Sequence, residues 1–318
     1  MSTITEYLTQ SELALAAYAN LGDGIPDTKA LQDAGMAQKQ AEEFASTYTV
    51  VAQFTDSATG LSATIFENIE THSKHLAIRG TNDGLDVLTD YLDIMLLGTA
   101  EYQYQYATLK STVQQWLNEG KLSDGFTVSG HFLGGFLASA LAVDFAAHIS
   151  HTYLYNTPGL GGVVGSPLLA LWNALNPGQS ITLPDSLAIS NIFAEAGPLI
   201  ISNLGTPVAP QLPIVIEDQS PNLIANHSIK YLTDALAIYD LFARVDPSVS
   251  VETVSTIINA ASNQTANTLE SALSALGALY DKGYPSTETD RDTFYANLYD
   301  LQAAVAGDDN DLNWRMAA

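Results

Sequence analysis

The residues of greatest chemical interest lie where a strand pattern meets a glycine-rich turn. Residues 126–128 read as a short β-strand, and the apolar spacing after residue 133 is that of a helix. Between them stands Gly130-His131-Phe132-Leu133-Gly134-Gly135, the frame of a nucleophile elbow, in which glycines permit a sharp turn from strand to helix. The N-terminus of the following helix directs N–H groups and a positive dipole end at an oxyanion. The pattern predicts acyl-transfer chemistry with residue 132 in the nucleophile position.

The nucleophile position itself is occupied by Phe132, whose phenyl ring cannot attack a carbonyl. Ser129 is no substitute, because it lies on the incoming strand and its side chain should not reach the apex. An elbow residue usually has a strained backbone that costs roughly 1–3 kcal/mol, and a bulky side chain increases the strain. Two origins fit: a replaced nucleophile in an otherwise intact hydrolase, and a lineage that lost catalysis. The retained glycines favour the first, so we expect an intact framework that is inactive as it stands.

The general base is expected downstream, because elbow hydrolases place nucleophile, acid and histidine in that order along the chain. Three histidines follow the elbow: His148, His151 and His227. His148 and His151 flank the start of the next expected strand, too close to the elbow helix to return to its apex. His227 lies in a loop that opens a helical pattern at 229–239. We predict that His227 is the base.

The acid that orients this histidine should follow a strand expected at 187–193. Glu195 is the carboxylate found there, and Asp218 is the alternative if the register differs. Either carboxylate could orient and stabilise the imidazolium. We expect Glu195 in this role and keep Asp218 as the second candidate.

The elbow resembles that of the class 3 lipases of the α/β-hydrolase superfamily, which commonly reads Gly-His-Ser-Leu-Gly-Gly; five of its six positions match here. A second segment, Leu76-Ala77-Ile78-Arg79-Gly80-Thr81-Asn82, resembles a strand end of the same lipases, where the residue after Arg-Gly supplies an oxyanion-hole donor. The resemblance implies that the backbone N–H groups of Thr81 and Leu133 bind the oxyanion. It covers residues 40–245, and it is closest to secreted bacterial lipases.

The resemblance also implies the α/β-hydrolase fold and the hydrolysis of carboxylic esters of lipids at a lipid–water interface, with no cofactor. Two acidic groups could attract Ca²⁺, but neither spacing follows a calcium-loop motif, so a solvated acidic face is favoured. These groups are Asp83, Asp86, Asp90 and Asp93, and Asp308, Asp309 and Asp311. Two other functions stay open: a non-catalytic lipid-binding protein that has lost its nucleophile, and an interaction module that uses its C-terminal helices.

The elements that would position these residues alternate between strand and helix patterns, which predicts an α/β fold with a mixed, mostly parallel sheet and added C-terminal helices. Strands are expected at 48–54, 61–68, 75–78, 126–128, 152–155, 187–193 and 214–216, and helices at 31–44, 106–117 and 229–239. Beyond residue 247 only helical patterns remain. We therefore predict a hydrolase domain at 1–247, including N-terminal helices, and a helical appendage at 248–318 that packs on it.

Two segments are candidates for mobile covers over an apolar site. Residues 145–184 contain no Asp, Glu, Lys or Arg, and glycines punctuate their apolar centre at 159–172. Such glycines favour a segment that opens over an apolar pocket, whereas the alternative is a buried crossover connection between strands. Residues 83–105 follow the oxyanion strand, where these lipases carry a lid, and a plain amphipathic helix fits them equally well.

The composition excludes several classes of protein. The 318 residues carry a formal net charge of −24, so a nucleic-acid binder is excluded because clustered Lys and Arg are missing. No apolar run reaches the length of a membrane-spanning helix, and the chain has no cysteine. The first residues lack the pattern of a cleaved secretory signal. Strong acidity predicts an extracellular protein exported without a signal peptide, and a cytoplasmic location is the alternative.

Overall fold

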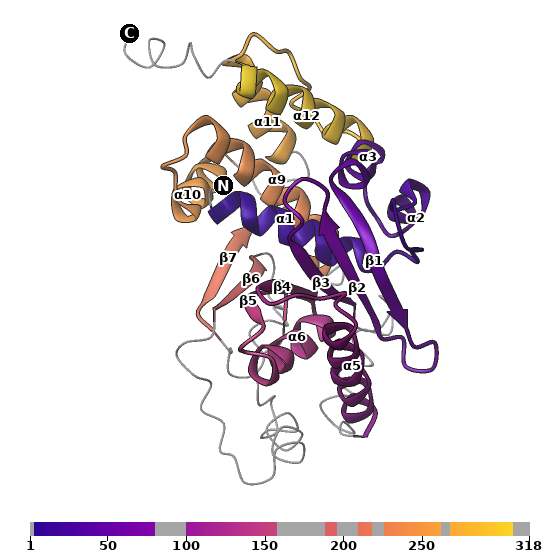
Figure 1. The fold of residues 1–318 in the computed structure, drawn as a ribbon. Helices are drawn as coiled ribbons and strands as arrows, with labels where there is room; N and C mark the ends of the chain where they lie inside the picture. Colours follow the sequence, from indigo (N-terminus) through magenta and orange to yellow (C-terminus); the bar gives the residue numbers. More distant parts are fainter. Residues whose placement is uncertain are drawn as a thin grey trace.

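The computed structural model describes residues 3–79, 100–157, 188–195, 209–217, 226–261 and 268–307. Within these ranges a single seven-stranded sheet follows chain order, with helices on both faces (Figure 1). Its strands are β1 (Tyr48–Thr55), β2 (Ser62–Asn68), β3 (Lys74–Arg79), β4 (Phe126–His131), β5 (Ile149–Tyr155), β6 (Ile189–Glu195) and β7 (Gln211–Val215). The first three strands pair antiparallel and β3 to β7 pair parallel. The sheet confirms the predicted α/β fold with a mixed, mostly parallel sheet.

The parallel register brings the functional segments to one edge of the sheet. Arg79, at the end of β3, is paired with His131, at the end of β4, and His131 is paired with Tyr155, at the end of β5. Further along, Glu195 of β6 is paired with Val215 of β7. The carboxyl ends of five strands therefore lie side by side, which is where ligands bind in open α/β sheets.

One face of the sheet is covered by α5 (Ala100–Asn118) and α6 (Leu133–Asp144). Leu109, Val113 and Leu137 of these helices belong to the same buried cluster as Leu76 of β3 and Val128 of β4. The spacing of Leu109, Val113 and Trp116 along α5 is the apolar stripe that the sequence shows, so the predicted helix at 106–117 is confirmed and begins earlier.

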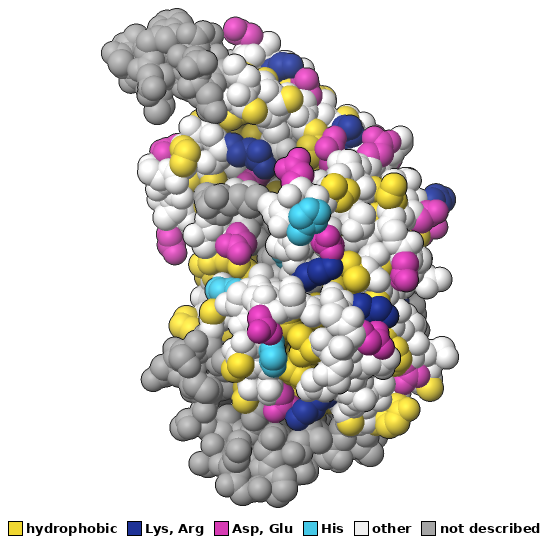
Figure 2. All heavy atoms as spheres, in the orientation of Figure 1, with side chains coloured by type: hydrophobic (Ala, Val, Ile, Leu, Met, Phe, Trp, Pro, Cys, Tyr) yellow, Lys and Arg dark blue, Asp and Glu magenta, His cyan; other side chains and the backbone are white. Residues whose placement is uncertain are grey.

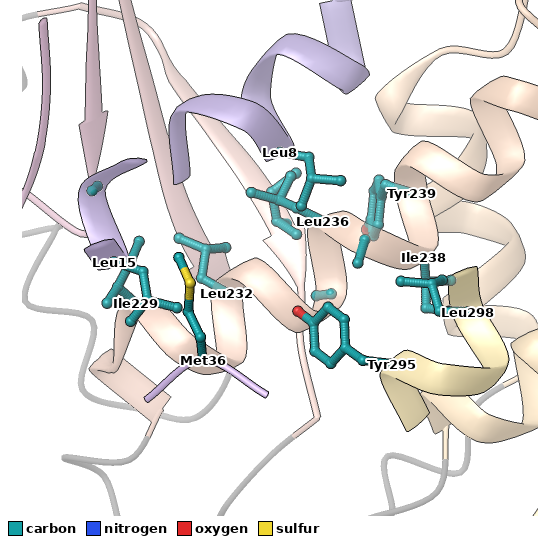
Figure 3. Packing of buried hydrophobic residues seen from close by; sticks show 14 of the residues in the cluster. Leu8, Leu15, Met36, Ile229, Leu232, Leu236, Ile238, Tyr239, Tyr295 and Leu298 are labelled. Atoms are coloured by element: carbon teal, nitrogen blue, oxygen red, sulfur yellow. The ribbon is translucent and has the colours of Figure 1, made fainter. Parts of the chain in front are cut away.

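The other face is covered by α1 (Thr3–Ala16) and α9 (Ile229–Val245), which pack against each other over the strands. Figure 3 shows Leu8 and Leu15 of α1 close to Leu232 and Leu236 of α9. The C-terminal helices α10 (Val251–Ala261), α11 (Thr268–Ala278) and α12 (Arg291–Gly307) contribute to the same buried cluster. The helices predicted beyond residue 247 are thus present, and they share one core with the helices over the sheet.

The single helix expected at 31–44 is wrong, because the structure has two helices there, α2 (Thr28–Asp33) and α3 (Gln38–Thr47). The chain leaves α2 through Gly35, which has a φ of +112° that side chains rarely adopt. The Gly35 N–H donates to the carbonyl of Gln32 and the Met36 N–H to that of Leu31, the pair of hydrogen bonds of a Schellman cap. The apolar spacing continues across this cap, which is why periodicity alone suggested one helix.

The surface fits an acidic chain. On the face seen in Figure 2, basic side chains of the described residues stand singly among acidic ones rather than in a patch. Several are paired, as Lys110 is with Asp144 at 2.6 Å and Lys282 with Asp300 at 2.9 Å. None of the described helices combines the length and the apolar character that spanning a bilayer requires.

Candidate active site

The turn between β4 and α6 has the conformation expected of an elbow. Phe132 is its only residue between strand and helix, with φ 53° and ψ −116°. This backbone lies outside the regions that side chains normally adopt, and a non-glycine residue there is strained by roughly 1–3 kcal/mol. The turn is held by the Phe132 N–H, which donates to the Tyr155 carbonyl at 2.9 Å.

Two glycines make the turn possible by allowing backbone to approach backbone. A Cβ atom at Gly130 would stand 2.5 Å from the carbonyl carbon and oxygen of Gly134. A Cβ atom at Gly135 would stand 1.9 Å from Oγ1 of Thr157 and 2.9 Å from the Gly130 carbonyl oxygen. The elbow therefore depends on the glycines that the sequence pattern contains.

Phe132 and the predicted base, His227, are in direct contact. Their rings meet edge to face, with 4.9 Å between centroids and an interplanar angle of 88°. Phe132 is buried, with 4% of its surface exposed. Within the described ranges the buried Nε2 atom of His227 has no hydrogen-bond partner. The structure thus brings the nucleophile position and the predicted base together, and a hydrocarbon ring lies where a hydroxyl could bond the imidazole.

His227 lies just before α9, whose N-cap Ser228 accepts a hydrogen bond from the Lys230 N–H. Its backbone carbonyl has two side-chain neighbours at hydrogen-bond distance, Nε2 of His131 at 2.8 Å and Nδ2 of Asn156 at 2.9 Å. Sequence reasoning missed Asn156, whose only signal was a polar residue at the end of an apolar strand.

Burial keeps both histidines of the site neutral. Burial lowers the pKa of His131 to about 4, although its hydrogen bond to the His227 carbonyl acts in the opposite direction. Burial, with a smaller contribution from His131, holds the pKa of His227 well below the usual 6.5. A neutral imidazole can accept a proton, so His227 is in the form that a general base needs.

The predicted oxyanion donors are placed only in part. Leu133 is the first residue of α6, so its N–H is among the first-turn donors that an α-helix leaves without an intrahelical partner. Thr81 lies outside the described residues, which end at Arg79 in that part of the chain.

The acid is not assigned by the geometry. Glu195 is exposed at the carboxyl end of β6, and among the described residues the hydrogen bonds at His227 involve His131 and Asn156 rather than Glu195. Asp218, the alternative, lies outside the described ranges. Glu195 and Asp218 both stay predictions.

The two histidines rejected from the sequence lie away from this site. His148 pairs with Asp124 at 2.6 Å and precedes β5, and Nε2 of His151 is 2.9 Å from the Ser190 hydroxyl near the start of β6. Both therefore stand at the amino edge of the sheet, opposite the elbow.

The two predicted covers and both possible calcium groups fall largely outside the described residues. Of the first cover, only residues 145–157 are described, and they form the turn after α6, the strand β5 and the two residues that follow it. Of the second, Gln105 is buried in α5 and donates to the Thr59 carbonyl at 2.8 Å, so this part is a packed helix. Among the residues with described positions, no group of three His, Asp or Glu side chains could hold a metal ion.

No protein-family model matches the chain, and no curated protein matches its sequence. Several solved lipase structures are similar in fold. A lipase from Yarrowia lipolytica is 15% identical, with 67% of this chain and 79% of that chain covered and a TM-score of 0.43. A lipase from Rhizopus microsporus var. chinensis is 17% identical over 65% of this chain and 69% of that chain, with a TM-score of 0.40. A Rhizomucor miehei lipase propeptide complex is 14% identical, with 69% of this chain and 70% of that chain covered and a TM-score of 0.41.

Proposed function

We propose that this chain has the framework of a serine ester hydrolase acting on lipids, in which Phe132 replaces the nucleophile, so that the chain does not hydrolyse esters as it stands. One observation carries the proposal: residue 132 has the strained elbow backbone, and its side chain contacts His227, whose buried Nε2 has no hydrogen-bond partner among the described residues. Strain of this kind persists where the surrounding structure over-determines it, and it clusters at active sites. The catalytic geometry is therefore retained while the reacting atom is missing.

A serine at position 132 would complete a nucleophile–base pair. Its Oγ would form a bond to the ester carbonyl carbon while His227 Nε2 takes the hydroxyl proton, and the resulting oxyanion would be stabilised by N–H groups at the start of α6. His227 would then give the proton to the departing alkoxide, and water would attack the acyl-enzyme by the same route. Thr81 as the second oxyanion donor, and Glu195 or Asp218 as the acid, belong to this proposal. No cofactor enters these steps.

The amino-acid sequence favours a lipid as the substrate. The uncharged segment 145–184 follows the elbow helix, and binding sites for small molecules are lined mainly by apolar side chains. The extracellular and bacterial character expected from the sequence stays a prediction.

The test is Phe132→Ser, compared with Phe132→Ala, which removes the same ring without adding a hydroxyl. We expect the unsubstituted chain and the alanine variant to show no turnover of p-nitrophenyl esters above background. The serine variant should react with a fluorophosphonate probe at position 132 and hydrolyse esters of graded chain length, with loss of both activities on adding His227→Ala. A serine variant that keeps its circular dichroism and cooperative unfolding yet stays unlabelled would show the assignment to be wrong. Turnover by the unsubstituted chain that His227→Ala abolishes would contradict the claim of inactivity.

A second function, non-catalytic lipid binding, is favoured by the same ring. Phe132 fills the nucleophile position with a buried apolar group and leaves no hydroxyl at the apex. Binding of a fluorescent fatty-acid ester by the unsubstituted chain, without turnover, would support this function over a disabled hydrolase.

A further inference from the structure

A line of hydrogen bonds lies behind His227 and takes no part in the steps above. The hydroxyl of Tyr18, in the turn after α1, is 2.9 Å from Nδ1 of His131. On the other side of the same ring, Nε2 of His131 is 2.8 Å from the backbone carbonyl of His227. A carbonyl oxygen can only accept, so Nε2 must carry the proton and donate it. Nδ1 of the neutral ring is then an acceptor, and the Tyr18 hydroxyl donates to it.

Asn156 reaches the same carbonyl from the next strand. The Ala194 N–H donates to Oδ1 of Asn156 at 2.8 Å, which fixes the orientation of the side-chain amide, because an N–H group must face the oxygen. Nδ2 therefore faces the His227 carbonyl and donates to it at 2.9 Å. Asn156 is 3% exposed and has a φ of +47°, a left-handed conformation that asparagine tolerates better than most residues.

We infer that His131 is a positioning residue for His227: as the Nε2–H tautomer held by Tyr18, it donates to the His227 carbonyl and, together with Asn156, fixes the base against the elbow. This inference rests on the proposed function. The loop of His227 is thereby tied to the ends of β4 and β5, the strands next to the turn that carries residue 132. The residue before the nucleophile position thus orients the base through the backbone carbonyl of His227.

The chemistry of the surroundings fits this role. The groups around the His131 ring are the Tyr18 hydroxyl, the His227 and Phe132 rings, and Arg79 as its register partner on β3. Burial lowers the pKa of His131 to about 4, so the ring stays neutral and keeps one donor and one acceptor nitrogen throughout the neutral pH range. Without the Nε2–H donor, Asn156 would be the one described side chain left to hold the His227 carbonyl. A misplacement of about 1 Å at a reacting group can cost about 100-fold in rate.

The experiment is made in the Phe132→Ser chain. We expect His131→Leu to lower kcat about 10- to 100-fold with KM nearly unchanged. We expect His131→Gln to restore most of kcat, because the glutamine amide can place a donor close to the position of Nε2. The matched control is His75→Gln, which changes another buried histidine with a pKa lowered to about 4, bonded to Thr127 at the amino edge of the sheet. It should reduce stability and leave kcat as it is. A leucine variant with an unchanged kcat, or one whose loss the His75 control reproduces, would overturn the inference.

A second measurement needs no catalysis. In the unsubstituted chain labelled with ¹⁵N-histidine, NMR should show His131 as the Nε2–H tautomer between pH 5 and pH 8, with a slowly exchanging Nε2 proton. Tyr18→Phe should speed that exchange and reduce the tautomer's dominance. An Nδ1–H tautomer would overturn the inference whether or not the serine variant is active. If the serine variant is inactive and the Nε2–H tautomer is found, the proposed function fails, and with it the role of His131 in positioning a base, while its hydrogen bond to the His227 carbonyl stands.

Discussion

Replacing Phe132 by glycine and, separately, by alanine isolates the backbone strain of the elbow, because both changes remove the same ring. Loss of a buried phenylalanine to alanine costs about 3–5 kcal/mol. At φ 53° and ψ −116° the alanine Cβ is also strained, by about 1–3 kcal/mol. Glycine avoids this strain but loses about 0.4–1 kcal/mol through the greater freedom of its unfolded chain. We therefore expect Phe132→Gly to be about 1–2 kcal/mol more stable than Phe132→Ala, the reverse of the usual order.

Urea unfolding followed by circular dichroism measures this difference as a shift in midpoint at constant slope. The control is Ala107→Gly on the exposed side of α5, where glycine should be the less stable residue by about 1 kcal/mol. Opposite signs at the two positions would support the strained elbow. An alanine variant at 132 as stable as the glycine variant, or more so, would refute the reasoning, because residue 132 would then have an ordinary backbone.

Two further predictions concern stability. Gly130→Ala should lower the free energy of unfolding by about 3 kcal/mol in urea titrations, because its Cβ would stand 2.5 Å from backbone atoms of Gly134. In the control Gly22→Ala, the added Cβ meets nothing within 4 Å, so the free energy of unfolding should change by less than about 0.5 kcal/mol. Burial raises the pKa of Glu12 to about 7, although the hydrogen bond from Gln40 acts in the opposite direction. Between pH 4.5 and pH 7 the folded chain therefore keeps a proton on Glu12 that the unfolded chain has lost, so stability falls as the pH rises through this range. Glu12→Gln should therefore stabilise the chain at pH 8 by up to about 3 kcal/mol and have little effect at pH 4, and an equal effect at both pH values would contradict the cause given.

The elements that the sequence predicts well are those whose pattern is local. The strands at 126–128 and 152–155 and the helix at 229–239 each combine an apolar run or stripe with a clear end, and each is present in the structure with shifted bounds. The helix expected at 31–44 fails because alanines keep the apolar spacing while Gly35 turns the chain. Periodicity reports which side of a segment is apolar, and it does not report the φ of a single residue between two such segments.

The site also contains residues that a local sequence pattern predicts and residues that it does not. The elbow and its glycines are one continuous segment, and His227 is the only downstream histidine that the topology can return to that segment, so both could be predicted. The contact of Tyr18 with His131 joins residues 113 positions apart in the chain, and it depends on where α1 crosses the sheet. The acid is harder still, because no local pattern of charge in the sequence encodes which carboxylate reaches His227 in the folded chain.

The persistence of the strained turn with phenylalanine at its apex follows from where the constraint originates. Gly130 and Gly135 let strand and helix approach so closely that the turn between them has little freedom, and the Phe132 N–H is bonded to the neighbouring strand. The backbone at 132 is thus imposed by its neighbours and does not depend on which side chain it carries. Phe132 opposes this backbone but gains by burial, since its ring is 4% exposed and packs edge to face on His227. The same packing occupies the place of a nucleophile, so the contact that stabilises this residue also removes the chemistry.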